Sequence, residues 1–346
     1  MKDILIGKTI DELTQVALDN GFRRFVGAQL ADWIYKKRVR SFDEITNLSI
    51  KARDTLAQNY EIGYAAPVDV VSSNDGTRKY LFPTKNGNHV EAVYIPSQTS
   101  RTLCISSQAG CRMGCAFCMT GRMGFLENLT AGEIVNQIMG VDESTELTNV
   151  VFMGMGEPLD NMEHVLRAIE VITSAWGLAW SPTRITLSTV GVAKNLDAFL
   201  RQTRVSLAVS LHNPFHEERL KMMPVENSNA IEKTLEIVGN HDFTHHRRLS
   251  FEYIMFSGVN DTARHADELI RRLNLLKTPG GGTLNEVRVN LIRFHQIPDS
   301  PLRGSSAETI KWFNAYLNKA GILTTTRTSR GEDILAACGM LSASKQ

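Results

Sequence analysis

The alternation of apolar and polar residues changes its period twice along the chain. Up to about residue 60 the period fits helices, and Leu30, Trp33 and Ile34 recur at the spacing of a single helix face. The segment Ser41–Glu44 places Ser and Glu at the spacing of a capping box, which marks the start of a helix. We therefore expect residues 1–65 to form a small helical domain.

Between about residues 68 and 95 the period becomes two, which is typical of half-buried strands. Three such runs, Val68–Val71, Lys79–Phe82 and Val90–Ile95, are separated by Asn-Asp-Gly and Asn-Gly-Asn sequences. Both sequences favour tight turns between antiparallel strands. The pattern predicts a short antiparallel β extension over residues 66–100.

From residue 101 onward, strand patterns and helix patterns alternate. The candidate strands are Thr102–Ser106, Asn149–Met153, Arg184–Ser188, Val205–Leu211, Ser250–Phe256 and Glu286–Ile292. The candidate helices are Ala131–Met139, Met162–Thr173, Ala193–Leu200, Ala230–Val238, Ala263–Leu275 and Glu308–Leu317. Six such units predict an α/β fold with a parallel, incomplete (βα)6 barrel over residues 101–320. A last strand pattern, Ile322–Arg327, opens a C-terminal segment, residues 321–346.

The composition is that of an ordinary globular enzyme. The 346 residues are 42% hydrophobic and 22% charged, and no apolar run reaches the length of a membrane span. The N-terminus lacks a signal-peptide pattern, and five cysteines are few for a secreted disulfide framework. We therefore expect a cytoplasmic protein without a membrane partner.

Charge adds one local feature to this picture. The net charge is only +1, but residues 23–53 carry eight basic and three acidic side chains. Such an excess can bind RNA phosphates, although it is also what a solvated helix face looks like.

Three closely spaced cysteines are the strongest chemical signal. Cys111, Cys115 and Cys118 have the spacing C-x₃-C-x₂-C, directly after the first strand of the predicted barrel. Thiolates are the usual ligands of iron–sulfur clusters, and three of them leave one iron of a 4Fe–4S cluster open. A zinc knuckle would need a nearby fourth ligand, but His89 and His164 are far along the chain. Inert buried thiols are the remaining alternative.

This spacing, with Phe117 before the last cysteine, resembles the signature of radical S-adenosylmethionine (SAM) enzymes. After the second strand, the run Met153–Pro158 resembles the Gly-Gly-Glu-Pro motif that holds the amino group of SAM in these enzymes. The resemblance implies a 4Fe–4S cluster and SAM as cofactors. The open iron would chelate SAM, and the reduced cluster would cleave it to a 5′-deoxyadenosyl radical.

Further motifs give a closer resemblance, to the RlmN family of bacterial RNA methyltransferases. They are Arg101–Phe125, Met153–Leu159, Leu187–Val192, Ser210–His212 and the tail Arg330–Gly339. The resemblance implies methylation at C2 of adenosine in 23S rRNA and in the anticodon loop of tRNA. It also implies an electron donor such as flavodoxin or ferredoxin, and we expect a monomer. The related Cfr enzymes, which act at C8, share the five-cysteine layout and remain an alternative.

The same resemblance assigns roles to residues outside the cluster motif. Cys338 would take a methyl group from one SAM, and the radical from a second SAM would activate that methyl group for addition to the adenine. Glu91 would accept the C2 proton. Cys104 would then attack the sulfur of Cys338, release the RNA and form a transient disulfide. Each of these residues also has an ordinary, non-catalytic interpretation. Cys338 could be an inert buried thiol, Cys104 a core residue and Glu91 an exposed strand residue.

The resemblance also carries over a set of SAM contacts. They are Gly156, Glu157, Ser188, Ser210, Leu211, His212 and His295. Many family members have Asn at the position of His295, and both side chains can hydrogen-bond to adenine or ribose.

The sequence around Cys338 predicts a mobile catalytic tail. Gly331 and Gly339 flank this cysteine, and Arg327 and Arg330 are close by.

A function of a different class remains open as well. It is a non-catalytic, metal-containing protein that binds nucleic acid through the basic N-terminal segment.

Overall fold

The structure is a computed structural model, which describes residues 2–243, 247–276 and 287–343. Glu286, the first residue of one predicted strand, lies outside these residues. None of the helices in the described ranges combines the length and the apolar character that a membrane span requires.

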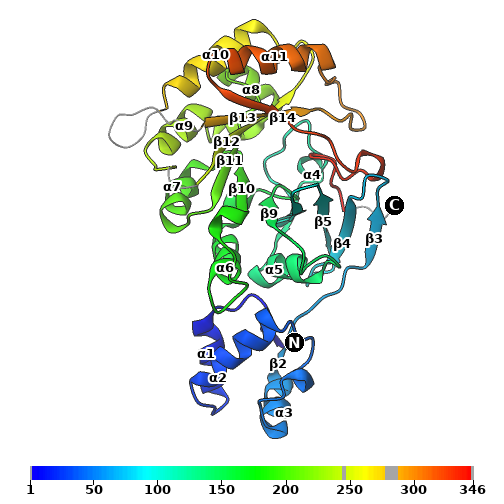
Figure 1. Cartoon of the computed structure of the whole chain (residues 1–346), viewed down its shortest axis with the longest axis vertical. Helices are drawn as coiled ribbons and strands as arrows, with labels where there is room; N and C mark the ends of the chain where they lie inside the picture. Colours follow the sequence, from blue (N-terminus) through cyan, green and yellow to red (C-terminus); the bar gives the residue numbers. More distant parts are fainter. Residues whose placement is uncertain (1, 244–246, 277–286, 344–346) are drawn as a thin grey trace.

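Ten strands of the described chain form one sheet (Figure 1). In chain order they are β3 (Asp69–Ser72), β4 (Arg78–Pro83), β5 (His89–Pro96), β6 (Arg101–Cys104), β9 (Asn149–Phe152), β10 (Ile185–Thr189), β11 (Ser206–Ser210), β12 (Leu249–Met255), β13 (Val287–Arg293) and β14 (Leu323–Thr326). The spatial order is β14-β13-β12-β11-β10-β9-β6-β5-β4-β3. Every strand predicted from the hydrophobic pattern is therefore present, with ends shifted by a few residues.

The sheet is parallel from β6 to β14 and antiparallel from β3 to β6. Among the described strands, β3 and β14 each have one neighbour, so the sheet stays open. This confirms the predicted α/β fold with an incomplete barrel. The antiparallel strands continue the barrel sheet through the pairing of β5 with β6, whereas the sequence pattern shows only a separate meander.

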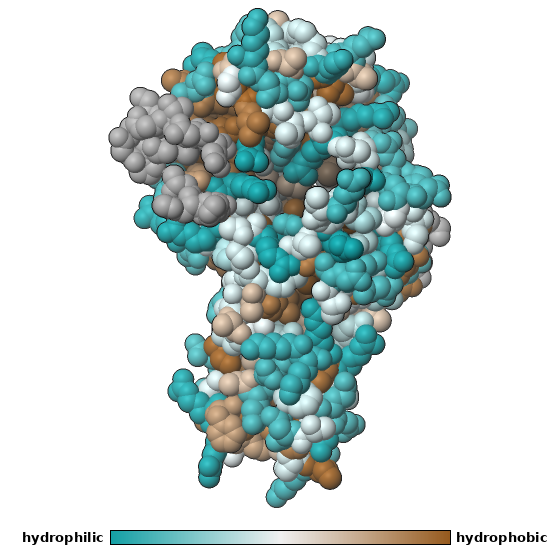
Figure 2. All heavy atoms as spheres, in the orientation of Figure 1, coloured by the Kyte–Doolittle hydropathy of each residue, from teal (hydrophilic) through white to brown (hydrophobic). Residues whose placement is uncertain are grey.

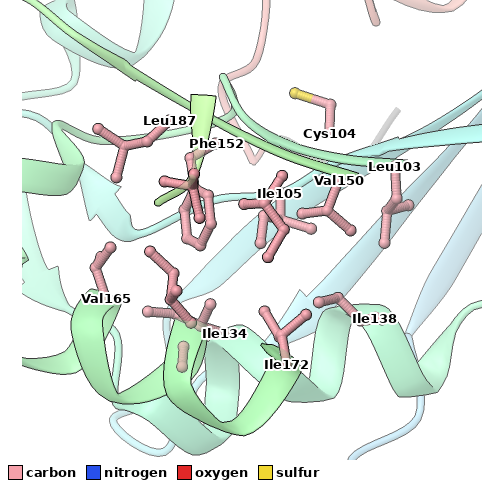
Figure 3. Packing of buried hydrophobic residues seen from close by; sticks show 14 of the residues in the cluster. Leu103, Cys104, Ile105, Ile134, Ile138, Val150, Phe152, Val165, Ile172 and Leu187 are labelled. Atoms are coloured by element: carbon pink, nitrogen blue, oxygen red, sulfur yellow. The ribbon is translucent and has the colours of Figure 1, made fainter. Parts of the chain in front are cut away.

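Amphipathic helices follow the parallel strands. They are α5 (Ala131–Gly140), α6 (Met162–Thr173), α7 (Ala193–Gln202), α9 (Ile231–Gly239), α10 (Ala263–Asn274) and α11 (Ala307–Lys319), all close to their predicted ranges. Figure 3 shows how α5 and α6 cover one face of the sheet, with Ile134, Ile138 and Ile172 against Val150 and Leu103. These side chains are buried, and their removal from water stabilises this face.

Cys104 points away from this hydrophobic layer. In Figure 3, Leu103 and Ile105 extend toward the helices, whereas the sulfur of Cys104 lies on the opposite side of the strand. Alternation along a strand sends successive side chains to opposite faces. Cys104 therefore faces the inner side of the open barrel.

The N-terminal unit is helical, as predicted. It contains α1 (Ile10–Asp19), α2 (Phe25–Ala31), a π-helical turn over Asp32–Lys36, and α3 (Ile50–Asn59). The predicted capping box exists, although the helix that Ser41 begins is a single 3₁₀ turn, Phe42–Glu44. The sequence pattern missed the pairing of β1 (Asp3–Ile4) with β2 (Tyr60–Glu61), which joins the two ends of the unit.

Polar contacts fix the N-terminal unit on the core. Arg38 donates hydrogen bonds to the side chain and the carbonyl of Ser144, and Arg167 of α6 lies 3.2 Å from the carboxylate of Glu12. Arg38 is therefore part of the junction rather than a free surface cation.

Short elements that the hydrophobic pattern did not predict surround the cysteine motif. A hairpin of β7 (Gln108–Gly110) and β8 (Phe125–Asn128) encloses it, together with α4 (Met119–Arg122). Another short helix, α8 (His216–Met222), follows β11.

Candidate active site

A first cavity lies at the C-terminal ends of the parallel strands, the edge where barrels of this kind carry their functional groups. It has a volume of about 150 Å³. The cysteines of the C-x₃-C-x₂-C motif, Cys111, Cys115 and Cys118, line it together with Cys338 of the tail. Of the seven predicted SAM contacts, five also line it: Gly156, Glu157, Ser188, Ser210 and His212.

Glycines allow the cysteine loop to begin beside the hairpin. Gly110 has a φ of 72°, and a Cβ atom there would lie 1.9 Å from the carbonyl oxygen of Gly124. Any other residue would clash with the hairpin backbone, so glycine is required. Further along, the N–H of Ala116 donates to the carbonyl of Met222 at 2.9 Å, which joins the loop to the end of α8.

The cysteine set fits a cluster. Cys111, Cys115 and Cys118 line one cavity, and each cysteine of a 4Fe–4S cluster binds a different iron, so three thiolates leave one iron open. Burial raises the pKa of all three thiols, that of Cys111 to about 12. Binding of a metal centre offsets the cost of holding them as thiolates.

Three hydrogen bonds orient Glu157 in the wall of the first cavity. Its carboxylate accepts hydrogen bonds from the Thr189 hydroxyl at 2.7 Å, the Val190 N–H at 2.9 Å and the Leu159 N–H at 3.0 Å. Burial nevertheless raises its pKa to about 7, because these donors offset desolvation only in part. The neighbouring Gly156 has a φ of 94° and packs against Gln108, where a Cβ would clash. A carboxylate in this position can accept hydrogen bonds from an ammonium group.

His212 lies at the end of β11 in a left-handed conformation, with a φ of 56°. Its Nδ1 accepts a hydrogen bond from the Ile254 N–H at 3.1 Å, and its ring meets Phe117 edge-on at 5.0 Å. Burial, and to a smaller extent the nearby Arg219, lowers its pKa to about 3. The ring is therefore neutral, with its proton on Nε2, and can donate one hydrogen bond.

The other two predicted SAM contacts do not line the first cavity. Leu211 is fully buried, and its carbonyl accepts a hydrogen bond from Arg219. His295 lines a second cavity, where its Nε2 lies 2.9 Å from the Ser329 hydroxyl and its Nδ1 lies 3.5 Å from Glu332. In this structure His295 thus contacts the C-terminal segment.

The second cavity, of about 400 Å³, joins Cys104 to Cys338. Cys338 belongs to the walls of both cavities, as do Met153, Ile292 and Leu341. The charged residues in the second wall are basic, Arg327 and Arg330, beside His295. Burial raises the pKa of the Cys104 thiol, and only Arg327 and a backbone contact oppose that effect. The two predicted relay cysteines therefore share one largely apolar cavity, whose charged lining residues are two arginines.

Glu91 lines neither cavity and is 1% exposed. One carboxylate oxygen lies 3.1 Å from the ammonium of Lys79, and the other accepts a hydrogen bond from the Ser342 N–H at 2.9 Å. The ordinary expectation of an exposed strand glutamate is therefore wrong.

The tail that carries Cys338 is docked at several points. Met119 donates its N–H to the Gly339 carbonyl at 2.8 Å, which joins the tail to the cysteine loop. Asp333 accepts from the Ser73 hydroxyl at 2.6 Å, beside β3. Figure 1 shows this red segment between α4 and the antiparallel strands. The predicted mobility of the tail stays a prediction.

Comparison with known proteins decides the family. Residues 105–290 match the family model for the radical SAM superfamily, and residues 4–62 match the model for the ribosomal RNA large subunit methyltransferase N-terminal domain. A relative named RlmN from Porphyromonas gingivalis is 53% identical over 99% of this chain and 95% of its own length. The dual-specificity RNA methyltransferase RlmN of Syntrophus aciditrophicus is 38% identical over 96% of this chain and 94% of its own.

The chain belongs to the RlmN family. It is thus a radical SAM RNA methyltransferase, and membership implies the 4Fe–4S cluster and SAM that the cysteine motif predicted. The fold agrees, because a radical SAM methyltransferase from Sphaerobacter thermophilus superposes with a TM-score of 0.91. That protein is 36% identical, and the match covers 99% of this chain and all of the other.

Two buried charged residues that the hydrophobic pattern does not reveal, Arg219 and Glu252, support the site of this RlmN family member. Arg219 is fully buried, forms an ion pair with Glu226, and donates to the carbonyls of Val190 and Ser210 at the ends of β10 and β11. Glu252 lines the first cavity and pairs with Arg327 at 3.3 Å. A buried charge is invisible in a hydrophobic pattern, and only its tertiary partners reveal it.

Proposed function

We propose that this enzyme methylates C2 of adenosine in 23S rRNA and in tRNA by way of a methyl group carried on Cys338. The observation that carries the proposal is the position of Cys338 in the wall between two cavities. The first cavity contains the cluster cysteines, and the second contains Cys104. The relatives are named dual-specificity RNA methyltransferases, and the N-terminal family model is named for ribosomal RNA large subunit methyltransferases, which supports RNA as the substrate.

The first cavity would bind SAM twice in each turnover. When bound, the cluster and SAM supply an organic radical that can remove a hydrogen atom from a methyl group on Cys338. Glu157 would accept hydrogen bonds from the amino group of SAM, because its carboxylate is buried and already oriented by backbone donors. Ser188, Ser210 and neutral His212 would hydrogen-bond the rest of the molecule. Leu211 and His295 would act from outside this cavity.

The second cavity would hold the adenine and release it. After the carbon joined to Cys338 has been added to C2, the adduct carries one unpaired electron. It would give up that electron to the redox centre that Cys111, Cys115 and Cys118 would hold, and Glu91 would take the C2 proton. The thiolate of Cys104 would then attack the Cys338 sulfur, so that an S–S bond forms and the C–S electron pair leaves with the carbon. That carbon takes up a proton and becomes the methyl group. Arg327 and Arg330 would attract the RNA phosphates to this cavity.

The remaining parts of the chain would serve RNA recognition and the tail. We propose residues 1–65 as the RNA-binding accessory domain, 66–100 as the strand extension, 101–320 as the catalytic core and 321–346 as the tail segment. The enzyme would act in the cytoplasm as a monomer and take electrons from a flavodoxin or ferredoxin.

The trapped adduct tests this proposal. Cys104→Ala keeps the carbon carrier but lacks the releasing thiolate, so it should remain covalently attached to RNA through Cys338. A denaturing gel of Cys104→Ala from cells should show a nuclease-sensitive, RNA-linked band. Cys338→Ala and the double variant are the matched controls, and both should lack the band. Methylation by Cys338→Ala, or the same band in the double variant, would refute the relay.

The modified position needs its own measurement. Mass spectrometry of nucleosides from RNA treated with the enzyme should show 2-methyladenosine. Detection of 8-methyladenosine in its place would assign the enzyme to the Cfr-like alternative, with the same cysteine relay.

A further inference from the structure

A buried ion pair joins two neighbouring strands of the antiparallel extension. Lys79 of β4 lies 3.1 Å from Oε1 of Glu91 in β5, and the two side chains are 7% and 1% exposed. In the register, Lys79 pairs with Val93, so the two charges are diagonal neighbours across the strands. Burial of two charges is costly even when they pair. A pair of apolar residues here would stabilise the fold as well as this ion pair does. The ion pair therefore indicates a functional role for the carboxylate of Glu91.

The second oxygen of Glu91 is covered by the tail. Oε2 accepts the Ser342 N–H at 2.9 Å, and the preceding residue, Leu341, lines both cavities. Glu91 itself lines neither. The tail therefore contacts Glu91 through Ser342 and both cavities through the adjacent Leu341.

We propose that Lys79 is a positioning residue for Glu91 and that Oε2 is the atom that accepts the C2 proton. The proposal rests on the proposed function of Glu91 as the proton acceptor. Lys79 holds Oε1, so the carboxylate is fixed in place and Oε2 is the oxygen that faces the tail. Oε2 is free to act when the Ser342 N–H leaves it. The proton then passes from C2 to Oε2, the C–H electron pair stays with the adenine ring, and the Lys79 ammonium keeps its protons.

A variant of Lys79 should block one stage of turnover only. Reconstituted full-length Lys79→Met should cleave SAM, methylate Cys338 and add to RNA as the unchanged protein does. Loss of the oriented base should slow release of methylated RNA about tenfold or more. The covalent protein–RNA adduct should therefore persist on a denaturing gel. Lys79→Arg, which keeps the cation, should restore release, and Lys85→Met, on the exposed turn after β4, is the matched control.

Two further variants separate this inference from the proposed function. Glu91→Gln should trap the adduct by itself; normal release in that variant would refute the role of Glu91, whatever Lys79 does. Lys79→Met/Glu91→Gln removes both charges and so avoids an unpaired buried carboxylate. It should trap the adduct to the same degree as Glu91→Gln, because Lys79 acts through Glu91. Normal release by Lys79→Met, equal loss of SAM cleavage and release, or additive effects in the double variant would each overturn the inference.

Discussion

At the scale of single residues, Glu157 illustrates how burial and hydrogen bonding compete. Three donors hold its carboxylate, yet its pKa is raised to about 7 because desolvation is the larger effect. The same side chain would meet an ammonium group when SAM is bound. The surroundings of Glu157 therefore suit a bound cation, and without one they disfavour the ionised carboxylate.

This balance predicts a pH dependence of stability. The folded-state pKa of Glu157 is above the ordinary value of 4.5, so its stabilising contribution is complete below about pH 4.5 and is lost as the pH rises through about 7. Without SAM, the unchanged protein should lose roughly 1 kcal/mol of unfolding free energy relative to Glu157→Gln between about pH 6 and pH 8. Urea unfolding of both proteins across that range measures the difference. A constant difference would show that the carboxylate is not desolvated.

At the scale of elements, α8 stabilises the strand ends that form the first cavity. Arg219 donates to the Leu211 carbonyl at 2.9 Å, in addition to Val190 and Ser210, and its charge is balanced by Glu226. One buried side chain thus connects the loops after β10 and β11. His216 also contacts Glu226, at 2.8 Å.

Removal of the Arg219 guanidinium should strongly lower the free energy of unfolding. Arg219→Met leaves the buried carboxylate of Glu226 without its main partner and should lower the unfolding free energy by about 3–5 kcal/mol. Denaturant unfolding measures the loss, and Arg219→Met/Glu226→Gln should recover a large part of it. Arg201→Met on α7 is the control, because its pair with Asp197 is exposed and should contribute little. Equal losses in the buried and exposed variants would contradict this account.

At the scale of the whole molecule, the N-terminal unit lies apart from the strand ends that form the first cavity. Figure 1 places α1, α2 and α3 at one end of the long axis, and Figure 2 shows that the molecule narrows above them. Arg23 and Arg24 are exposed before α2, whereas Lys36 and Lys37 are about half exposed and lie near Asp32.

If this surface binds RNA phosphates, its cations should set the salt dependence of binding. RNA binding should weaken when four cations are replaced by Ala: Arg23, Arg24, Lys36 and Lys37. Arg38 is kept because it hydrogen-bonds to Ser144. The slope of log K against log salt should flatten by about 0.7–0.9 for each phosphate that is no longer neutralised. Filter binding over a salt series measures the slope, and SAM cleavage should not change. Lys233→Ala with Arg201→Ala, on the outer helices, is the control. An unchanged slope would assign the basic stretch to a solvated helix face.

The sequence by itself determined the order and type of the main elements, and it contains the C-x₃-C-x₂-C spacing that predicts the cluster ligands. These are local properties: the hydrophobic period, the capping residues and the spacing of Cys111, Cys115 and Cys118. Each depends on residues within one or two turns or strands. Only the tertiary structure decided which distant groups meet. It brought Cys338 beside Cys104, separated His295 from the first cavity, covered Glu91 with Lys79 and the tail, and used Arg38 at a junction. These contacts join segments tens to hundreds of residues apart. Their geometry is fixed by strand order and by buried charge pairs, which no local periodicity records.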